Sequence, residues 1–183
     1  MGKGTQASKI LRPLCQGTQY YLGKGLHTLG VLGWALRQMG RSEVYVSTFS
    51  TSEAFLSGFL GLRRKGLVER AVLLADLKAS RKTRELYRLM SRCFDDVYLG
   101  QNHSKVVLIR SMSGDTLSVI TSQNQTYGDR CEATMVTVDK EAYARLMEGF
   151  KEMVNDNSIL VDGLFDRLIA RDRGQGDGDD VAR

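Results

Sequence analysis

Four polar residues in two short segments of the chain have the types and the spacing to handle a phosphate. His103 and Lys105 are separated by one residue, as are Ser122 and Asn124. Residues two apart on a β-strand point to the same face of the sheet. An imidazole is a nucleophile, an ammonium group is a fixed cation, and a hydroxyl and an amide supply hydrogen bonds. Together these groups are suited to holding a phosphate and attacking it.

The two segments flank a predicted β-hairpin. Residues 106–109 and 117–120 are rich in β-forming residues, and Ser113-Gly114 between them is typical of a turn. If Ser113-Gly114 is a two-residue loop, then Met112 pairs with Asp115. This register can be extended outward to the polar residues.

In this register Lys105 lies opposite Ser122, and His103 lies opposite Asn124. Directly opposed side chains on one face have Cβ atoms roughly 4.5–5.5 Å apart. The four polar groups would therefore converge on one patch. A slip of one residue would break this arrangement, because it moves one strand's side chains to the other face.

These residues resemble the motifs of the phospholipase D superfamily, which read His-x-Lys-(x)4-Asp and Gly-Ser-x-Asn. The segments 103–105 and 122–124 match, but Arg110 stands in place of the Asp and Thr121 in place of the Gly. Arg110 differs in parity from His103, so on a regular strand it points to the opposite face. We interpret the lost Asp as a change in structural support and not in the groups that contact phosphate.

The resemblance implies a mechanism that needs two His-x-Lys units at one site. One His attacks phosphorus and forms a phosphohistidine, and the other protonates the leaving oxygen. This chain has one such unit, and His27 is followed two residues later by Leu29. Family members with one unit complete the site across a two-fold homodimer. Lysines supply the positive charge, so no metal or other cofactor is expected.

Two roles fit Glu132, which lies at the start of another predicted strand. It is either a solvated charge or, as the resemblance implies, a carboxylate that hydrogen-bonds the catalytic His and fixes its orientation. The predicted catalytic residues are His103, Lys105, Ser122, Asn124 and Glu132.

The order of the predicted elements favours the α/β class, with a mixed β-sheet flanked by helices, as in phospholipase D-like proteins. Strands are expected at 43–49, 68–75, 96–99 and 133–138 besides the hairpin. Helices are expected at 25–38, after Ser52, after Ser80, after Asp139 and at 157–170, and residues 1–17 are expected to form a loose arm. We expect one domain over residues 1–170 and a disordered tail over 171–183.

The charge of the chain suits an anionic partner. Lys and Arg number 26 against 21 Asp and Glu, a formal net charge of +5. A predicted helix carries arginines at helical spacing on one face, which is either a solvated face or a surface that tracks phosphates. These arginines are Arg81, Arg84, Arg88 and Arg92.

The three cysteines are widely spaced, which fits a reducing cytoplasm better than a disulfide framework, and with two His a zinc site is not expected. No signal peptide or transmembrane span is expected. We therefore predict a cytoplasmic, metal-independent phosphodiesterase, an endonuclease, that acts on nucleic acid, with DNA favoured. Two alternatives stay open: a non-catalytic nucleic-acid-binding protein, or a phospholipid phosphodiesterase or phosphatidyl transferase.

Overall fold

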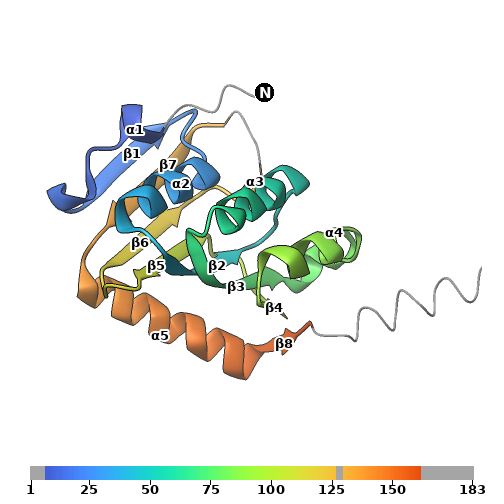
Figure 1. The fold of residues 1–183 in the computed structure, drawn as a ribbon. Coiled ribbons are helices and arrows are strands. Elements are labelled where there is room, and N and C mark those ends of the chain that lie inside the picture. The colour runs from blue at the N-terminus through green and yellow to red at the C-terminus, as the bar shows by residue number, and fades with distance from the viewer. Residues whose placement is uncertain (1–6, 127–129, 162–183) are drawn as a thin grey trace, which may run out of the picture.

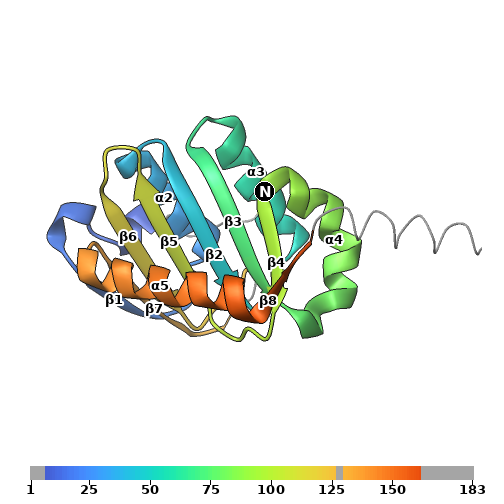
Figure 2. The ribbon, with the colours of Figure 1, turned by 90° about the horizontal axis from the view of Figure 1, so that it is seen from below.

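The computed structural model of the chain describes residues 7–126 and 130–161. Its centre is a mixed sheet of eight strands in the order β1-β7-β6-β5-β2-β3-β4-β8 (Figures 1 and 2). The strands are β1 (Gln19–Gly23), β2 (Ser42–Thr48), β3 (Val68–Asp76), β4 (Asp96–Gly100), β5 (Val106–Ser111), β6 (Thr116–Thr121), β7 (Glu132–Thr137) and β8 (Ser158–Leu160). Strands β2, β3 and β4 are parallel, and the other neighbouring pairs are antiparallel. The predicted α/β class with a mixed sheet is confirmed.

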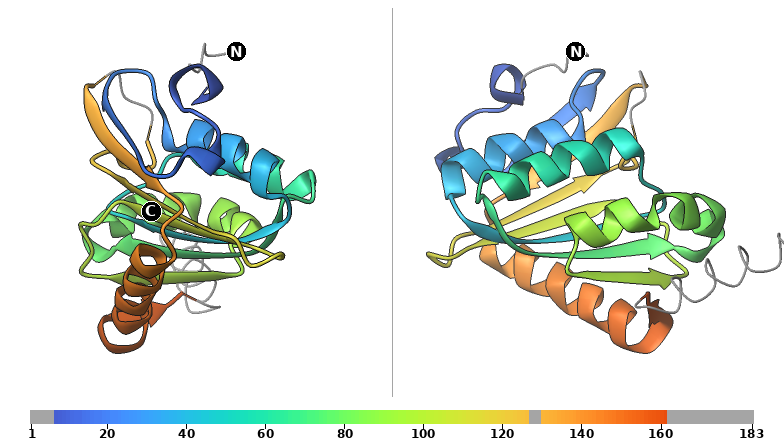
Figure 3. Two further views of the ribbon diagram at one scale, coloured as in Figure 1. Left: turned by 90° about the vertical axis from the view of Figure 1, so that its left-hand side faces the viewer. Right: turned by 45° about the vertical axis from the view of Figure 1, so that its right-hand side comes forward.

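Helices cover both faces of this sheet. The helices α2 (Thr28–Met39), α3 (Glu53–Arg64) and α4 (Ser80–Cys93) lie on one face, and α5 (Lys140–Asn157) crosses the other (Figures 1 and 3). Helices α3 and α4 are the crossovers that parallel strands require between β2, β3 and β4. Residues 101–105 then lead from β4 past the ends of β3 and β2, and the hairpin β5–β6 and strand β7 extend the sheet beyond β2.

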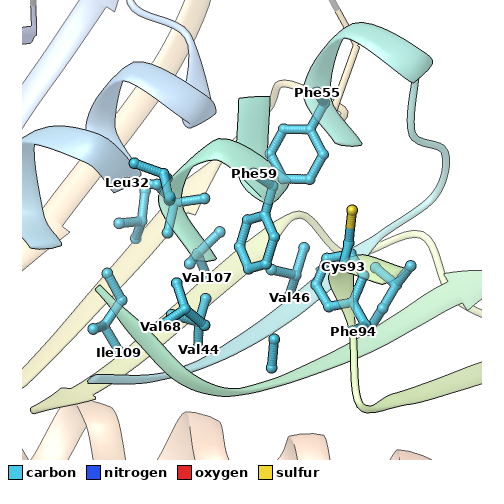
Figure 4. Close-up of a cluster of buried hydrophobic side chains, with 14 of the residues drawn as sticks. Leu32, Val44, Val46, Phe55, Phe59, Val68, Cys93, Phe94, Val107 and Ile109 are labelled. Carbon is cyan, nitrogen blue, oxygen red and sulfur yellow. The ribbon is translucent and has the colours of Figure 1, made fainter. Parts of the chain in front are cut away.

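The main core lies between α2–α4 and the sheet. In Figure 4, Leu32 from α2 and Phe59 from α3 pack above Val44 and Val107 of the sheet. Phe59 and Phe94 stack with their ring centroids 4.7 Å apart. Full burial of such a side chain stabilises the fold by roughly 1.5–3 kcal/mol. This packing fixes the strands whose ends carry the polar residues described below.

A second, smaller core lies under α5. Tyr143, Met147 and Phe150 of this helix pack on Leu74 and Leu108 of the sheet. Burial raises the pKa of Tyr143 to about 12. Because side chains alternate along the strands, they pack into two cores, one on each face of the sheet.

Two of the predicted helix starts are confirmed by their caps. The Ser52 Oγ accepts a hydrogen bond from the Phe55 backbone N–H at 3.3 Å, and an Asp139 carboxylate oxygen accepts one from the Ala142 N–H at 2.8 Å. Ser80, by contrast, is the first residue within α4, because the 3₁₀ turn η2 (Leu77–Ala79) precedes it.

The sequence-based expectation was wrong at both ends of the described chain. Instead of a loose arm, the N-terminal segment forms α1 (Ala7–Ile10) and the 3₁₀ turn η1 (Leu14–Gln16), with Leu11 buried, and strand β1 was not anticipated. Residues 158–160, expected within a helix, form β8, which pairs with β4. The rest of that predicted helix and the predicted tail lie outside the described residues.

Candidate active site at one edge of the sheet

All five predicted catalytic residues lie at the same edge of the sheet. Strands β2, β3, β4 and β6 end there, while the antiparallel strands β5 and β7 begin there. His103 and Lys105 immediately precede β5, and Ser122 and Asn124 follow β6. Glu132 is the first residue of β7. The topology thus gathers the two halves of the motif at one edge of the sheet.

The predicted hairpin register was wrong by one residue. Val106 pairs with Ile120, so the loop has three residues instead of two. The Ser111 N–H donates to the Asp115 carbonyl oxygen at 2.9 Å, and Gly114 has a φ of +93°. A glycine in the left-handed region is typical of three-residue hairpin loops with a G1 bulge.

The corrected register changes what lies opposite the motif residues. The Thr121 N–H donates to the Lys105 carbonyl oxygen at 3.0 Å, so Lys105 lies opposite Thr121 and not opposite Ser122. The predicted pairing of His103 with Asn124 fails for the same reason. Moreover, His103 and Lys105 precede the strand, so their side chains are directed by the loop and not by strand alternation.

His103 and Lys105 contact each other. The Lys105 Nζ donates to the His103 carbonyl oxygen at 2.7 Å and lies 3.4 Å from its Nδ1. The His103 ring is exposed and packs on Phe49, with the ring centroids 5.2 Å apart at 55°. The imidazole is therefore held on one side by an aromatic ring and at one nitrogen by an ammonium group.

Ser122 and Glu132 form a second pair. The Ser122 Oγ donates a short hydrogen bond to the Glu132 carboxylate and accepts one from the Ala133 N–H at 3.1 Å. Of the two roles open to Glu132, the hydrogen bond with His103 is not found among the described residues, where the Glu132 carboxylate accepts from Ser122. Among the described residues, no hydrogen bond or ion pair joins this second pair to His103 or Lys105.

The loop after β6 is anchored to the loop after β2. The Gln125 N–H donates to the Ser50 carbonyl oxygen at 3.1 Å, and the Ser52 Oγ donates to the Gln125 carbonyl oxygen at 3.2 Å. The Gln125 side chain is 1% exposed, yet both of its amide atoms lack a hydrogen-bond partner among the described residues. The Asn124 Oδ1 is also buried and has no hydrogen-bond partner among the described residues.

Sequence reasoning did not place His27 at this edge. Its Nδ1 lies 3.2 Å from the Nε2 of Gln123, whose Oε1 accepts from the Thr28 N–H at 3.0 Å. A small cavity beside them is lined by Phe55 and Asn124, among others. Both histidines of the chain therefore lie at one edge of the sheet, although nothing in the spacing of His27 indicates this.

The chain is similar to known proteins in structure, but not detectably in sequence. The sequence matches no protein-family model and no curated protein. The structure is similar to a phospholipase D family member, Nuc from Salmonella typhimurium, with a TM-score of 0.51 and 12% identity over 76% of this chain and 96% of Nuc. The chain has the phospholipase D fold.

Two further structures extend this similarity. NucT from Helicobacter pylori has a TM-score of 0.54 at 12% identity over 76% of this chain and 98% of NucT. A polyphosphate kinase from Porphyromonas gingivalis has a TM-score of 0.54 at 10% identity, over 82% of this chain but 28% of the kinase. The chain therefore spans nearly the whole of two neighbours and less than a third of the other.

Within the phospholipase D fold, the residue that departs most from the motif is Arg110. Its Nη2 lies 2.7 Å from a Glu43 carboxylate oxygen, and the two residues are paired between β5 and β2. Both point to the face that α5 covers, on the same side as Leu108, while Val107 and Ile109 enter the main core. Arg110 therefore lies on the face of the sheet that α5 covers and is paired with Glu43 there. That it points away from His103 stays a prediction, because the loop and not the strand directs the His103 side chain.

The predicted nucleic-acid-binding arginines belong to α4. Arg88 and Arg92 are exposed, and their side chains lie one turn apart. The side chains of Arg81 and Arg84 lie outside the described part of the structure, although the helix backbone includes both. Arg88 and Arg92 are therefore the members of this set that can be tested on structural grounds.

The described residues contain neither a metal-binding cluster nor a membrane-spanning helix. No group of three or more His, Cys, Asp or Glu side chains in this part of the chain could hold a metal ion. None of its helices combines the length and the apolar character needed to span a membrane.

Proposed function

We propose that the protein is a phosphodiesterase of the phospholipase D superfamily, an endonuclease that works without a metal and attacks phosphorus with His103. The observation that carries this proposal is the exposed His103 imidazole with the Lys105 ammonium group beside it, at the strand ends of a phospholipase D fold. An exposed nucleophile beside a fixed cation is the minimum needed to bind a phosphodiester and react with it.

The reaction proceeds in two displacements. A ring nitrogen of His103 forms a bond to phosphorus while the bond from phosphorus to the leaving oxygen breaks, and an acid gives that oxygen a proton. Water then attacks phosphorus, the P–N bond breaks, and His103 is regenerated. Lys105 and Asn124 stabilise the charge on the phosphoryl oxygens. The Ser122–Glu132 pair keeps a carboxylate at the rim of the site.

The proton donor comes from a second copy of the chain in this proposal. One His-x-Lys unit supplies one nucleophile, and a two-fold dimer would place a second His103 at the same phosphate. Light scattering should then give twice the monomer mass. A strict monomer that still cleaves phosphodiesters would rule out the shared site and leave His27 as the other histidine at this edge.

Nucleic acid is the proposed substrate, with DNA favoured. The formal charge of +5 suits a polyanion, and Arg88 and Arg92 present cations on an exposed helix face. No separate recognition domain is evident in the described residues, so contacts to the backbone should dominate and sequence preference should be weak.

The decisive experiment is nicking of supercoiled plasmid in excess EDTA. Wild type should nick the plasmid, and His103→Ala should lose turnover while it keeps its fold and its affinity for DNA. Mixed dimers of wild type and His103→Ala should also be inactive if each site needs both copies. Loss of nicking on chelation with rescue by magnesium would contradict the proposal, as would full activity of His103→Ala.

A non-catalytic nucleic-acid-binding protein is the second candidate. It is favoured by Arg110 in place of the motif Asp and by the pairing of Glu132 with Ser122 instead of His103. This candidate predicts binding to DNA without cleavage, and binding that His103→Ala leaves unchanged. A phospholipid hydrolysis assay, run in parallel, separates nucleic acid from lipid as the substrate.

A further inference from the structure

The loop that carries His103 is fixed from below by the buried side chain of Asn102. This residue is 4% exposed, and its Nδ2 donates toward the Leu74 carbonyl oxygen at 3.0 Å and the Ser47 Oγ at 2.9 Å. The Thr48 carbonyl oxygen lies 3.3 Å from the same nitrogen. Asn102 thus binds the ends of β2 and β3 at once, from the position next to His103.

The other end of the amide fixes the residue after His103. The Asn102 Oδ1 accepts from the Ser104 N–H at 3.0 Å and from the Ser104 Oγ at 2.7 Å. The hydroxyl oxygens of Ser104 and Ser47 lie 2.5 Å apart. The two neighbours of His103 are therefore hydrogen-bonded to each other and to Ser47, which leaves the backbone of His103 little freedom.

A buried carboxylate completes this network. Asp76, at the end of β3, is 6% exposed, and its carboxylate accepts from the Asn102 N–H at 2.8 Å and the Lys78 N–H at 2.7 Å. Burying a carboxylate costs free energy unless hydrogen bonds satisfy it, and here backbone N–H groups do so. One of these groups belongs to Asn102, so Asp76 fixes the backbone of the residue that precedes His103.

We infer that Asn102, Ser47 and Asp76 are positioning residues that set the His103 imidazole for attack, in place of the support that the motif Asp would give. The inference rests on the proposed function. Arg110 occupies the position of that Asp and forms an ion pair with Glu43 on the face of the sheet that α5 covers. Phe49 restrains the ring, while the Asn102 network restrains the backbone from which the ring projects. An error of about 1 Å in the position of a reacting group can lower a rate about 10²-fold.

The test compares kcat, KM and the His103 signal in single variants. Ser47→Ala removes one hydroxyl from the network, Ser47→Thr retains it, and Asn102→Ala removes the centre of the network. We expect kcat to fall about 10²-fold in Asn102→Ala and less in Ser47→Ala, with KM unchanged and with recovery in Ser47→Thr. If Asn102→Ala does not fold, the Ser47 pair still decides.

Ser118→Ala is the matched control. Ser118 is a fully buried serine of β6 whose hydroxyl has no partner among the described residues. The chain has two histidines, so NMR of the imidazole groups gives two resolvable signals, which His27→Gln assigns. The His103 signal should shift or broaden in Ser47→Ala and not in Ser118→Ala.

The outcomes separate this inference from the proposed function. If wild type cleaves DNA and both Asn102→Ala and Ser47→Ala keep its kcat, the positioning role is overturned and the proposed function stands. If wild type cleaves nothing, the proposed function is overturned. In that case, an unchanged His103 signal in Ser47→Ala and Asn102→Ala also overturns the structural part of the inference, and a changed one supports it.

Discussion

The ammonium nitrogen of Lys105 lies 2.7 Å from the carbonyl oxygen of His103 and 3.4 Å from its Nδ1. An ammonium group can only donate, so its hydrogen bond to this carbonyl oxygen fixes the Lys105 side chain beside the His103 imidazole. The proposed function uses both groups: the imidazole would attack phosphorus, and the ammonium group would stabilise the charge on the phosphoryl oxygens.

The first prediction concerns the charge of Lys105. Lys105→Gln should lower kcat by about 10²–10³-fold, the usual cost of losing one group that stabilises a developing oxyanion. The free energy of unfolding should change little, because the ammonium group is at the surface. Single-turnover plasmid nicking measures the effect, and Lys151→Gln on the exposed side of α5 is the control. Equal rates in the two variants would remove Lys105 from the chemistry.

The second prediction concerns the turn that sets the hairpin register. Gly114 has a φ of +93°, and a Cβ added there would meet no atom within 4 Å, so only backbone strain opposes a side chain at this position. Gly114→Ala should therefore lower the free energy of unfolding by about 1 kcal/mol. Gly61→Ala, within α3 and equally unobstructed, should raise it by roughly 0.5–1 kcal/mol. Urea unfolding of both variants checks the pair, and a neutral Gly114→Ala would contradict the strained turn.

The same turn shows where sequence reasoning lost the register. Ser113-Gly114 predicts a hairpin correctly, but the dipeptide fits two-residue and three-residue loops alike. The Ser111 Oγ accepts from the Asp115 N–H at 2.9 Å, and this contact closes the longer loop. A side-chain contact of this kind has no signature in the hydrophobic pattern. One residue of error was enough to move Lys105 from Ser122 to Thr121.

The sequence predicted the hairpin that carries the motif residues, but not the residues that support them. Apolar runs predicted β2, β3 and the hairpin, and the motif residues were placed on extensions of the hairpin strands, whereas His103 and Lys105 lie in the loop before β5. Asn102 gives no such signal, because a single Asn before the motif has no characteristic spacing. The pattern that could have found it is polar residues such as Ser47 and Asp76 at the ends of otherwise apolar strands.

The short edge strands failed for a different reason. Strand β8 has three residues, and its pairing of Leu160 with Tyr98 depends on where the end of α5 delivers the chain. Strand β1 is a short segment with Tyr20 and Leu22 exposed, so it lacks a buried alternation strong enough to predict it. In both cases tertiary contacts decide the conformation, and local propensity does not.

The third prediction uses the pH dependence of a structural ion pair. Both terminal nitrogens of the Arg63 guanidinium donate to Asp95, at 2.8 and 3.0 Å, and the Ala71 N–H donates to the same carboxylate at 2.7 Å. Burial acts to raise the pKa of Asp95, but these donors outweigh it and lower the pKa below its ordinary value. A carboxylate with a lowered folded pKa stabilises the fold above its unfolded pKa, and that contribution is lost as pH falls through the folded pKa.

Asp95→Asn should therefore lower the free energy of unfolding by roughly 1 kcal/mol at pH 7, after allowance for partial exposure. The difference from wild type should shrink as the pH falls below about 4. Glu141→Gln breaks an exposed pair with Arg145 and is the control, with little effect expected at either pH. A difference for Asp95→Asn that stays constant from pH 7 down to about pH 3 would contradict the assignment.

The fourth prediction tests α4 as a surface that binds phosphates. Each neutralised phosphate contributes about −0.9 to the slope of log affinity against log salt on duplex DNA. Replacing both Arg88 and Arg92 with Ala should flatten this slope by roughly one to two units and weaken binding equally across sequences. The double variant Arg41→Ala and Arg145→Ala, which carries the same charge change elsewhere, should leave the slope closer to wild type. Identical slopes for the two double variants would make α4 an ordinary solvated face.

The last prediction compares two buried glutamines on one loop. Gln123 is 5% exposed and its Oε1 serves the Thr28 N–H, whereas Gln125 is 1% exposed and its amide has no partner among the described residues. A buried unsatisfied polar group costs roughly 1–3 kcal/mol, and an apolar side chain of similar shape relieves that cost. Gln125→Met should therefore be neutral or raise the free energy of unfolding. Gln123→Met should lower the free energy of unfolding by roughly 1–3 kcal/mol, because it leaves the Thr28 N–H without an acceptor.

Thermal unfolding of both variants measures the difference. If Gln125→Met is as destabilising as Gln123→Met, the Gln125 amide has a hydrogen-bond partner in solution.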